Sequence, residues 1–257
     1  MKALPSASRQ IYNVWYRNFL QFRRTWTVSL FWILIEPTVI LGSIGFGVGS
    51  YINNVNGVSY IDFFFPGLLC STAMMVSFFE STYGNFSKLT YQKVYVTMIL
   101  SPIEAYQIVA GEVIWAATKG TLSSVGVALV AVPFGLLGTW KIFPTLAVIF
   151  ISALLFASLG MLVTSIVKNY DAIIYPTSGL IVPMSLLSGT YFPMDQMPAI
   201  LKYIVYLLPL SHSVALSRAL LLEKFEYMQL LHLLVLIVFS GFLFRLASKR
   251  IHAILIR

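Results

Sequence analysis

Side chains that could carry out chemistry are few and widely spaced in this sequence. The three histidines are His212, His232 and His252, and no H-E-x-x-H motif or cluster of carboxylates accompanies them. A zinc hydrolase requires such ligands close together. The stretch "LGSIG" around Ser43 is only faintly like the setting of a serine nucleophile, and no histidine is placed to act as its base. We therefore expect no catalytic residue and no metal site.

The sequence motifs for nucleotide binding and for cysteine-based sites are also absent. No G-x-x-x-x-G-K-[ST] segment is present, so the chain has no P-loop with which to hold nucleotide phosphates. The single cysteine, Cys70, lies within an apolar run, which excludes a disulfide framework and a C-x-x-C metal site. Any energy from ATP must therefore come from another polypeptide.

The composition indicates a membrane protein. Of the 257 residues, 58% are hydrophobic and 10% are charged, whereas a soluble domain carries about 25% charged residues. A soluble protein of this composition would have too few charges on its surface to stay dissolved. In a membrane protein, the net charge of +8 bears first on topology rather than on nucleic acid. We expect no nucleic-acid partner.

Six apolar segments are long enough to be considered as membrane-crossing helices. A helix needs about 20 residues to cross the hydrocarbon layer. The sequence thus predicts an all-α membrane protein with six transmembrane helices. The first segment carries Glu36-Pro37, where a kink is expected, and the fifth is interrupted by Pro176, Gly179 and Pro183. The predicted spans are Thr27 to Val48, Phe63 to Tyr83, Gln107 to Leu137, Pro144 to Val167, Ala172 to Ser188 and Met228 to Leu246.

The basic residues predict the orientation of these spans. An even number of spans places both termini on one side. Lys119 is not counted because it falls within a span, and Arg245, next to the end of the sixth span, is counted with the side of the termini. The positive-inside rule makes the richer side, and therefore both termini, cytoplasmic. That side has Lys2, Arg9, Arg17, Arg23, Arg24, Lys88, Lys93, Lys168, Arg245, Lys249, Arg250 and Arg257, and the other has Lys141, Lys202, Arg218 and Lys224.

The first 26 residues predict an amphipathic helix. Apolar and basic residues alternate with helical spacing in "QIYNVWYRNFLQFRRTW". Aromatic residues on one face and arginines on the other favour an interfacial helix on the cytoplasmic leaflet. The alternative is an ordinary helix that packs on a soluble partner.

The loop between the second and third spans predicts a short cytoplasmic helix. Its centre, Thr90 to Leu100, is too polar to cross a membrane but has an apolar side, and the helix should end near Ser101-Pro102. Either it docks on a cytoplasmic partner or it packs on the protein's own spans.

Charged residues within the spans allow two interpretations. Glu112 and Lys119 share a helix face but lie about 10 Å apart along the axis, too far for direct pairing. Both, and likewise Glu80, either snorkel to the cytoplasmic surface or line a route for a substrate.

The region 190–227 predicts two short helices on the outer side. The segments "PAILKYIVYLL" and "SHSVALSRALLL" are too short to cross, which favours re-entrant helices. Ser211 is a candidate cap for the second. His212 and Arg218 are six residues apart and so do not share a helix face. They either meet polar headgroups or sugar, or satisfy buried carbonyls and lipid phosphates.

This arrangement resembles the ABC-2 type transporter permeases over essentially the whole chain. It is most similar to the permeases of lipo-oligosaccharide (nodulation-factor) exporters, through "FESTYGNFSKLTYQ", "AGEVIWAATKG" and "SGTYFPMDQMPAILKYIVYLLPLSHSVALSR". The resemblance implies one transmembrane domain, 1–257, made of the interfacial helix 1–26, a coupling helix 86–102, the spans and the outer region 190–227. It also implies a homodimer in the bacterial inner membrane, bound to two cytoplasmic ATPase subunits that hold ATP and Mg²⁺.

The same resemblance implies roles for particular residues. Val96 departs from the family pattern, in which an acidic residue often follows the aromatic residue at the position of Tyr95. The rival interpretation is an ATPase-independent membrane transferase or secondary carrier. The implied sets are Tyr91, Gln92, Tyr95, Thr97, Met98 and Pro102 for coupling to the ATPase; Tyr191, Phe192, Pro193, Pro209 and His212 for an outer gate; and Glu80, Glu112, Lys119 and Arg218 for polar positions along the pathway or an interface.

Overall fold

The chain is described here from a computed structural model. It covers residues 6–27, 35–36, 38–52, 54–55, 57–136, 140–194, 197–222 and 225–256. Within these ranges the backbone is overwhelmingly helical, and the extended pairing is limited to an isolated bridge between Val55 and Val58. The all-α prediction is confirmed.

Four of the described helices are long and apolar enough to cross a membrane. They correspond to the second, third, fourth and sixth predicted spans. They are α3 (Tyr60–Phe79), which continues through π-helical turns as far as Tyr91; α5 (Ala105–Ala131), extended by a 3-10 turn to Phe134; α6 (Ile142–Thr164); and α11 (Leu230–Leu255), preceded by the 3-10 turn η9 (Tyr227–Gln229).

The other two predicted spans are not seen as long helices. In the first, residues 28–34 and Pro37 lie outside the described residues, and the described remainder is a short helix, Thr38–Ser50. The fifth is a short apolar stretch, Asp171–Leu187, in which 3-10, α7 (Ile174–Pro176), π and α8 (Val182–Leu187) segments alternate. Its prolines, Pro176 and Pro183, are consistent with this irregularity. The count of six spans stays a prediction.

The core lies among α3, α5 and α6. Phe64, Phe78 and Phe156 are fully buried there. A glycine allows the backbones of α3 and α5 to come close: a Cβ at Gly120 would lie 2.7 Å from the carbonyl oxygen of Ala73. Small residues serve the same purpose in membrane helix packing generally.

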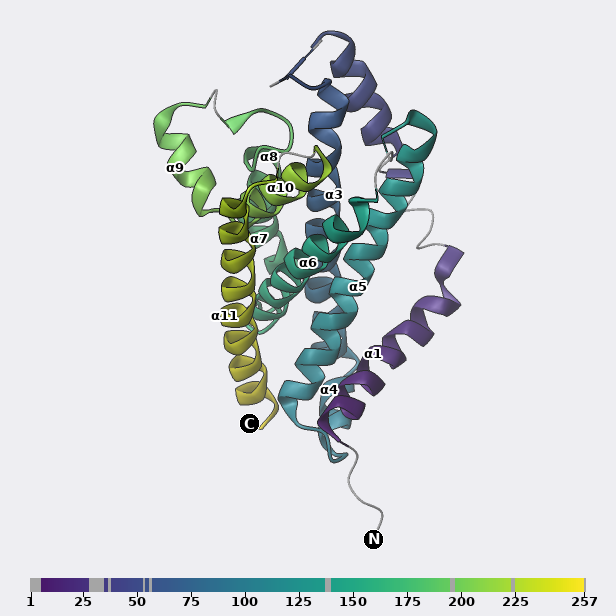
Figure 1. Cartoon of the computed structure of the whole chain (residues 1–257). Coiled ribbons are helices and arrows are strands. Elements are labelled where there is room, and N and C mark those ends of the chain that lie inside the picture. Colours follow the sequence, from purple (N-terminus) through teal and green to yellow (C-terminus); the bar gives the residue numbers. More distant parts are fainter. Residues whose placement is uncertain are drawn as a thin grey trace.

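The two ends of the molecule carry different short helices (Figure 1). One end, called the termini end below, has α1 (Ala7–Arg24), α4 (Val94–Ile99) and the C-terminal end of α11. The opposite end, called the hairpin end, has α9 (Ala199–Leu207) and α10 (Pro209–Leu221). The helices nearest the two termini, α1 and the C-terminal end of α11, thus lie at the same end, whereas their cytoplasmic location stays a prediction.

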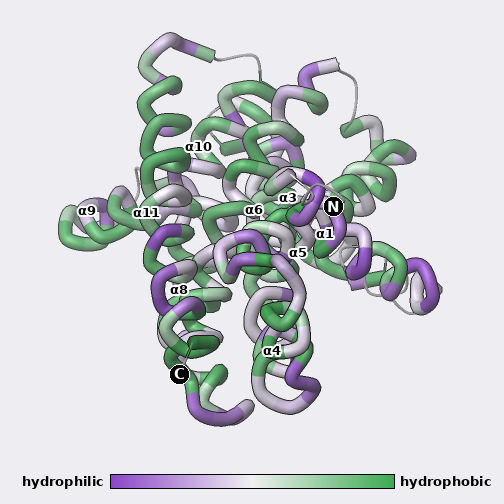
Figure 2. The backbone as a smooth tube through the Cα atoms, turned by 90° about the horizontal axis from the view of Figure 1, so that it is seen from below, coloured by the Kyte–Doolittle hydropathy of each residue, from purple (hydrophilic) through white to green (hydrophobic). Residues whose placement is uncertain are grey.

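The helices α9 and α10 form a hairpin bent by 88°. Two short helices are therefore confirmed, whereas their re-entry into the bilayer stays a prediction. The proposed Ser211 cap is wrong: α10 begins at Pro209, whose fixed φ suits the first helical position, and the Ser211 hydroxyl has no hydrogen-bond partner. Figure 2 shows α9 projecting from the body and composed mostly of hydrophobic residues.

The predicted coupling segment, 86–102, is divided in the structure. Residues up to Tyr91 continue the helix of the second span, which was expected to end at Tyr83. Lys88 does not stop this helix, because its ammonium group is paired inside the protein. Lys93, with φ 53°, makes the break, and α4 follows.

Candidate functional site

The N-terminal helix α1 is docked on the beginning of α5. Val14 is buried, and a Cβ at Gly111 would lie 2.5 Å from the Val14 Cβ, so only glycine permits this approach. Gln10 and Asn18 are also buried on this face of α1. The inward face is therefore partly polar, while Tyr12, Tyr16 and Leu20 are exposed.

A buried carboxylate explains the polar side chains on α1. Glu112 of α5 is fully buried and forms ion pairs with Arg17 Nη2 at 2.5 Å and Lys88 Nζ at 2.7 Å. Asn18 Nδ2 donates to the same carboxylate at 2.9 Å, and Lys88 Nζ also donates to the side-chain oxygens of Asn18 and Asn85. We call Arg17, Asn18, Asn85, Lys88 and Glu112 the Glu112 junction.

The Glu112 junction joins three parts of the chain. It connects α1 to the end of the second span, which precedes α4 in the chain, and to the start of the third span, which follows α4. Glu112 thus neither snorkels nor faces an open route in this structure, and internal pairing is a third arrangement that the sequence did not indicate. A buried charge needs such partners to offset its desolvation.

A second ion pair lies one step further into the bundle. Lys119 Nζ is 2.7 Å from Glu80 Oε2, and Trp115 Nε1 donates to Glu80 Oε1 at 2.9 Å. Glu112 and Lys119 do not pair with each other, as their separation predicted. Glu80 and Glu112 are each paired instead with basic side chains from other helical segments.

The residues assigned to ATPase coupling differ in exposure. Tyr91, Gln92, Thr97 and Pro102 are exposed, and Met98 is partly covered, with its sulfur 3.4 Å from Arg17 Nη1. Two exposed residues that were not assigned, Val96 and Leu100, extend this surface. In the sequence, these two residues could have been identified only by their place on the outward-facing side of a short amphipathic helix.

Tyr95 does not belong to that exposed surface. It is fully buried, packs with Ile108, Val109 and Ile251, and has no hydrogen-bond partner for its hydroxyl. Burial, followed by the nearby Glu112 carboxylate, raises the pKa of Tyr95 well above its ordinary value, so the phenol is neutral. Tyr95 therefore anchors α4 to the spans and is not placed to contact a partner.

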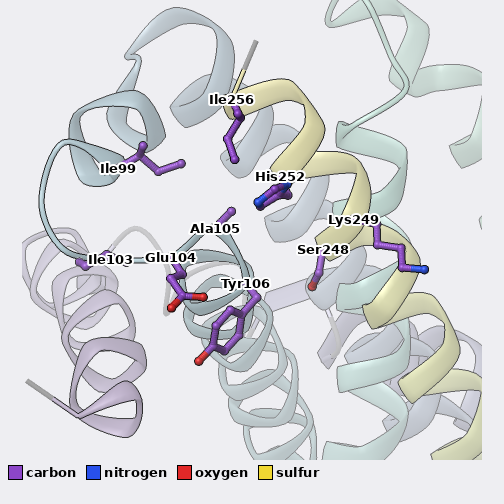
Figure 3. Close-up of a pocket in the computed structure, with 9 residues that line it drawn as sticks. All are labelled: Ile99, Ile103, Glu104, Ala105, Tyr106, Ser248, Lys249, His252 and Ile256. Carbon is purple, nitrogen blue, oxygen red and sulfur yellow. The ribbon is translucent and has the colours of Figure 1, made fainter.

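A cavity of about 430 Å³ lies beside α4 (Figure 3). The figure shows His252 directed from α11 toward Ala105, so the third histidine lies far from the other two. The cavity shows that the segment after α4 adjoins the C-terminal helix. Its lining consists of Ile99, Ile103, Glu104, Ala105, Tyr106, Ser248, Lys249, His252 and Ile256.

At the hairpin end, Arg218 binds backbone carbonyls. Its guanidinium donates to the oxygens of Phe63 and Gly189 at 3.0 and 2.8 Å and lies 3.8 Å from the centre of the Phe63 ring. Of the two roles considered for Arg218, the satisfaction of buried carbonyls matches the structure. Arg218 thereby joins α10 to α3 and to the turn before Tyr191.

The residues assigned to an outer gate lie around this contact. The Tyr191 ring lies tilted against that of Phe64, with ring centres 5.4 Å apart, and the Tyr191 carbonyl accepts a hydrogen bond from the Tyr60 hydroxyl at 3.2 Å. Pro193 is buried, whereas Phe192 is exposed. Pro209 begins α10 at the bend of the hairpin. The gating role of these residues stays a prediction.

Two histidines 20 residues apart meet at the hairpin end. The Nδ1 atoms of His212 and His232 are 2.7 Å apart, and His212 Nε2 lies 3.0 Å from the carbonyl oxygen of Tyr206. No third histidine, cysteine or acidic residue joins them within the described ranges. Sequence spacing gave no signal for this pair, because the two residues belong to different helices.

Arg218 gives a first testable prediction. Replacing it with leucine should lower the free energy of unfolding by about 1.5–3 kcal/mol, since a charged hydrogen bond to the Gly189 carbonyl is lost. Arg218→Lys should recover only part of this loss, because one ammonium group cannot reproduce the planar guanidinium. Thermal unfolding of the purified protein in detergent measures both effects. Equal stability of Arg218→Leu and the native chain would contradict the prediction.

Comparison with known proteins gives consistent matches. A family model described as ABC-2 type transporter matches residues 9–222. Nodulation protein J of Rhizobium leguminosarum bv. trifolii is 36% identical over 220 residues, covering 86% of this chain and 84% of that protein. Nodulation protein J of Rhizobium leguminosarum bv. viciae is 35% identical over 236 residues, covering 92% and 91%.

A more distant relative is Inner membrane transport permease YadH of Escherichia coli (strain K12). It is 24% identical over 210 residues, which cover 79% of each chain. No solved structure matches the chain significantly.

Proposed function

Because this chain belongs to the ABC-2 type transporter family, we propose that it is the transmembrane permease subunit of an ATP-driven exporter. The family match across residues 9–222 is the observation that carries this proposal. ATP is hydrolysed on a separate cytoplasmic ATPase, of which two copies serve two copies of this chain. The chain itself binds no nucleotide and catalyses no reaction.

The ATPase docks at the termini end. The exposed side chains of Tyr91, Gln92, Thr97 and Leu100 support this part of the proposal. They surround α4, whose opposite side is held to the spans by Tyr95. A helix that is exposed on one side and firmly anchored on the other is suited to receive a push from a partner and pass it inward.

The cargo is an amphipathic molecule, with a lipo-oligosaccharide as the leading candidate and a glycolipid or drug as others. The similarity to proteins named Nodulation protein J supports the lipo-oligosaccharide, given the resemblance of the sequence to exporters of that class. The similarity to a protein named as an inner membrane transport permease supports a location in the bacterial inner membrane. Outward transport is part of the proposal through the resemblance of the sequence to exporter permeases.

Movement begins when ATP draws the two ATPase subunits together. The α4 helices shift, and the Glu112 junction makes α1 and the ends of the second and third spans follow as one block. The first, second and fifth spans of the two copies then part to admit the cargo. Both copies return when ATP is hydrolysed.

An association experiment tests this function. The chain is co-expressed with a candidate Walker-motif ATPase from the same organism, and the complex is purified through a tag on the permease. Leu100→Glu should reduce recovery of the ATPase at least 10-fold, since a charge is placed in a desolvated contact. Trp140→Glu, at an exposed apolar residue of the loop between α5 and α6, is the matched control and should have no effect.

Transport assays separate this function from its rival. Proteoliposomes with both subunits should move a fluorescent acylated oligosaccharide only when ATP is supplied. Turnover or transport by the permease alone would contradict the proposal. If that activity also disappeared in Glu80→Gln or His212→Ala, the rival transferase or secondary carrier would be favoured.

A further inference from the structure

The last helix is built as a stiff connection between the two ends of the molecule. α11 runs without interruption from Leu230 to Leu255 and contains no proline. Its 26 residues make a helix about 39 Å long at 1.5 Å per residue. Figure 1 shows it extending from α10 at the hairpin end to the C-terminus at the termini end.

At the termini end, α11 is packed against the helix proposed to receive the ATPase. Ala247 and Ile251 are fully buried in one cluster with Tyr95 of α4. Ile99 and Leu255 pack against the same cluster. Because protein interiors are close-packed, α11 must move with α4 when α4 is displaced, since otherwise a void would open between them. Movement of α4 is therefore passed directly to the end of α11.

Between its ends, α11 packs along α6 on one side and is exposed on the other. Leu236 is its one fully buried residue outside the termini end. Leu234, Val238 and Phe242 are exposed, as is expected for the lipid-facing side of a membrane-crossing helix. A displacement of α11 therefore means that it slides along α6, while its exposed side needs no repacking against other parts of the protein.

At the hairpin end, the histidine pair joins α11 to the hairpin. The Tyr206 carbonyl can only accept, so His212 Nε2 carries the hydrogen and donates to it. In a neutral ring, His212 Nδ1 is then an acceptor, and His232 Nδ1–H is the donor. The imidazole of His212 thus links α9, α10 and α11 through two hydrogen bonds of defined direction.

We propose that α11 transmits movement of α4 to the outer hairpin, and that His212 and His232 are positioning residues that form the joint between them. The inference rests on the proposed function and adds a route from the ATPase contact to the exit. ATP-driven displacement of α4 shifts α11, and the histidine joint carries α9 and α10 with it. Breaking the joint leaves ATP hydrolysis intact but separates it from opening of the outer end.

The test measures the outer hairpin directly and needs no identified cargo. A single spin label is attached at Ile200→Cys, an exposed site on α9, in a Cys70→Ser background, which removes the one native cysteine. The label-to-label distance between the two copies is measured in the reconstituted permease–ATPase complex, with and without ATP and vanadate. We expect ATP to shift this distance in the otherwise native chain.

Variants of the joint give the decisive comparison. His232→Leu should abolish the ATP-dependent shift while ATP hydrolysis stays within about 2-fold of the native rate. His232→Asn should restore the shift, because its amide donates from near the place of Nδ1–H. Phe239→Leu, at an exposed position on the same helix, is the matched control and should behave like the native chain.

A second variant guards against a failure of His232→Leu to fold. Val238→Gly combined with Phe239→Gly weakens the helix in the middle of α11 at exposed positions, because glycine has a low helix propensity, and leaves both ends unchanged. It should also reduce the shift. If the shift persists unchanged in either variant, the transmission through α11 is overturned and the permease function stands. If ATP causes no shift in the otherwise native chain and no ATPase associates, the proposed function itself fails.

Discussion

Replacement of Glu112 by leucine should lower the free energy of unfolding by about 3–5 kcal/mol, because it leaves a buried cation without its partner. Lys88 is the stranded group: it is buried and 2.7 Å from the lost carboxylate. Arg17 has a third of its side chain exposed and can turn to solvent. We expect a marked fall in the melting temperature and in the yield of folded protein from detergent extracts.

A compensating variant identifies the cause of that loss. Glu112→Leu combined with Lys88→Met removes both buried charges, and such replacements of a buried ion pair are often close to neutral. The double variant should therefore be clearly more stable than Glu112→Leu alone. A double-mutant cycle in thermal unfolding gives the coupling energy. If the double variant is less stable than the native chain by the sum of the two single effects, the coupling energy is zero and the ion pair is not what holds this region.

The same variants bear on function. The Glu112 junction connects α1 to the helix ends on both sides of α4, so the neutral double variant keeps the fold but removes a directional restraint. If the junction makes these parts move together, ATP hydrolysis by the complex should continue in this variant while transport per ATP falls. Stability and coupling are thus separable at one site.

Much of the architecture follows from short-range patterns in the sequence. The alternation of apolar and basic residues predicted α1, and the prolines at 193, 198 and 209 predicted two short helices in the outer region. Four spans were visible as long apolar runs, since their composition depends on lipid and not on a particular neighbour. Such features are fixed by local composition and periodicity.

The missed features all depend on partners distant in sequence. Lys88 was expected to lie outside the second span, which was predicted to end at Tyr83. Glu112, 24 residues later, offsets the cost of burying this lysine, and the helix continues to Tyr91. Tyr95 was assigned to a partner surface through the family resemblance, and nothing nearby in sequence shows that Ile251 covers it. His212 and His232 meet only because α10 folds back onto α11.

Gly160→Leu should lower the free energy of unfolding by about 1–3 kcal/mol through overpacking. Gly160 lies on α6 where it crosses the second span, and a Cβ there would be 2.8 Å from the Phe78 carbonyl oxygen and 2.7 Å from the Ser81 Cβ. The first of these atoms belongs to a helix backbone, which cannot yield as a flexible side chain does. The α6 helix must therefore move away from the second span and lose part of the buried core.

The matched control is Gly241→Leu on α11. A Cβ at Gly241 would meet no atom within 4 Å, so the substitution there brings only the gain in helix propensity, about 0.5–1 kcal/mol over glycine. The same chemical change should thus destabilise at one glycine and stabilise at the other, and melting temperatures in detergent should move in opposite directions. A Gly160→Leu variant that melts at or above the native temperature would mean that α6 and the second span do not approach as closely as described, and the packing beneath the Glu112 junction would need a different account.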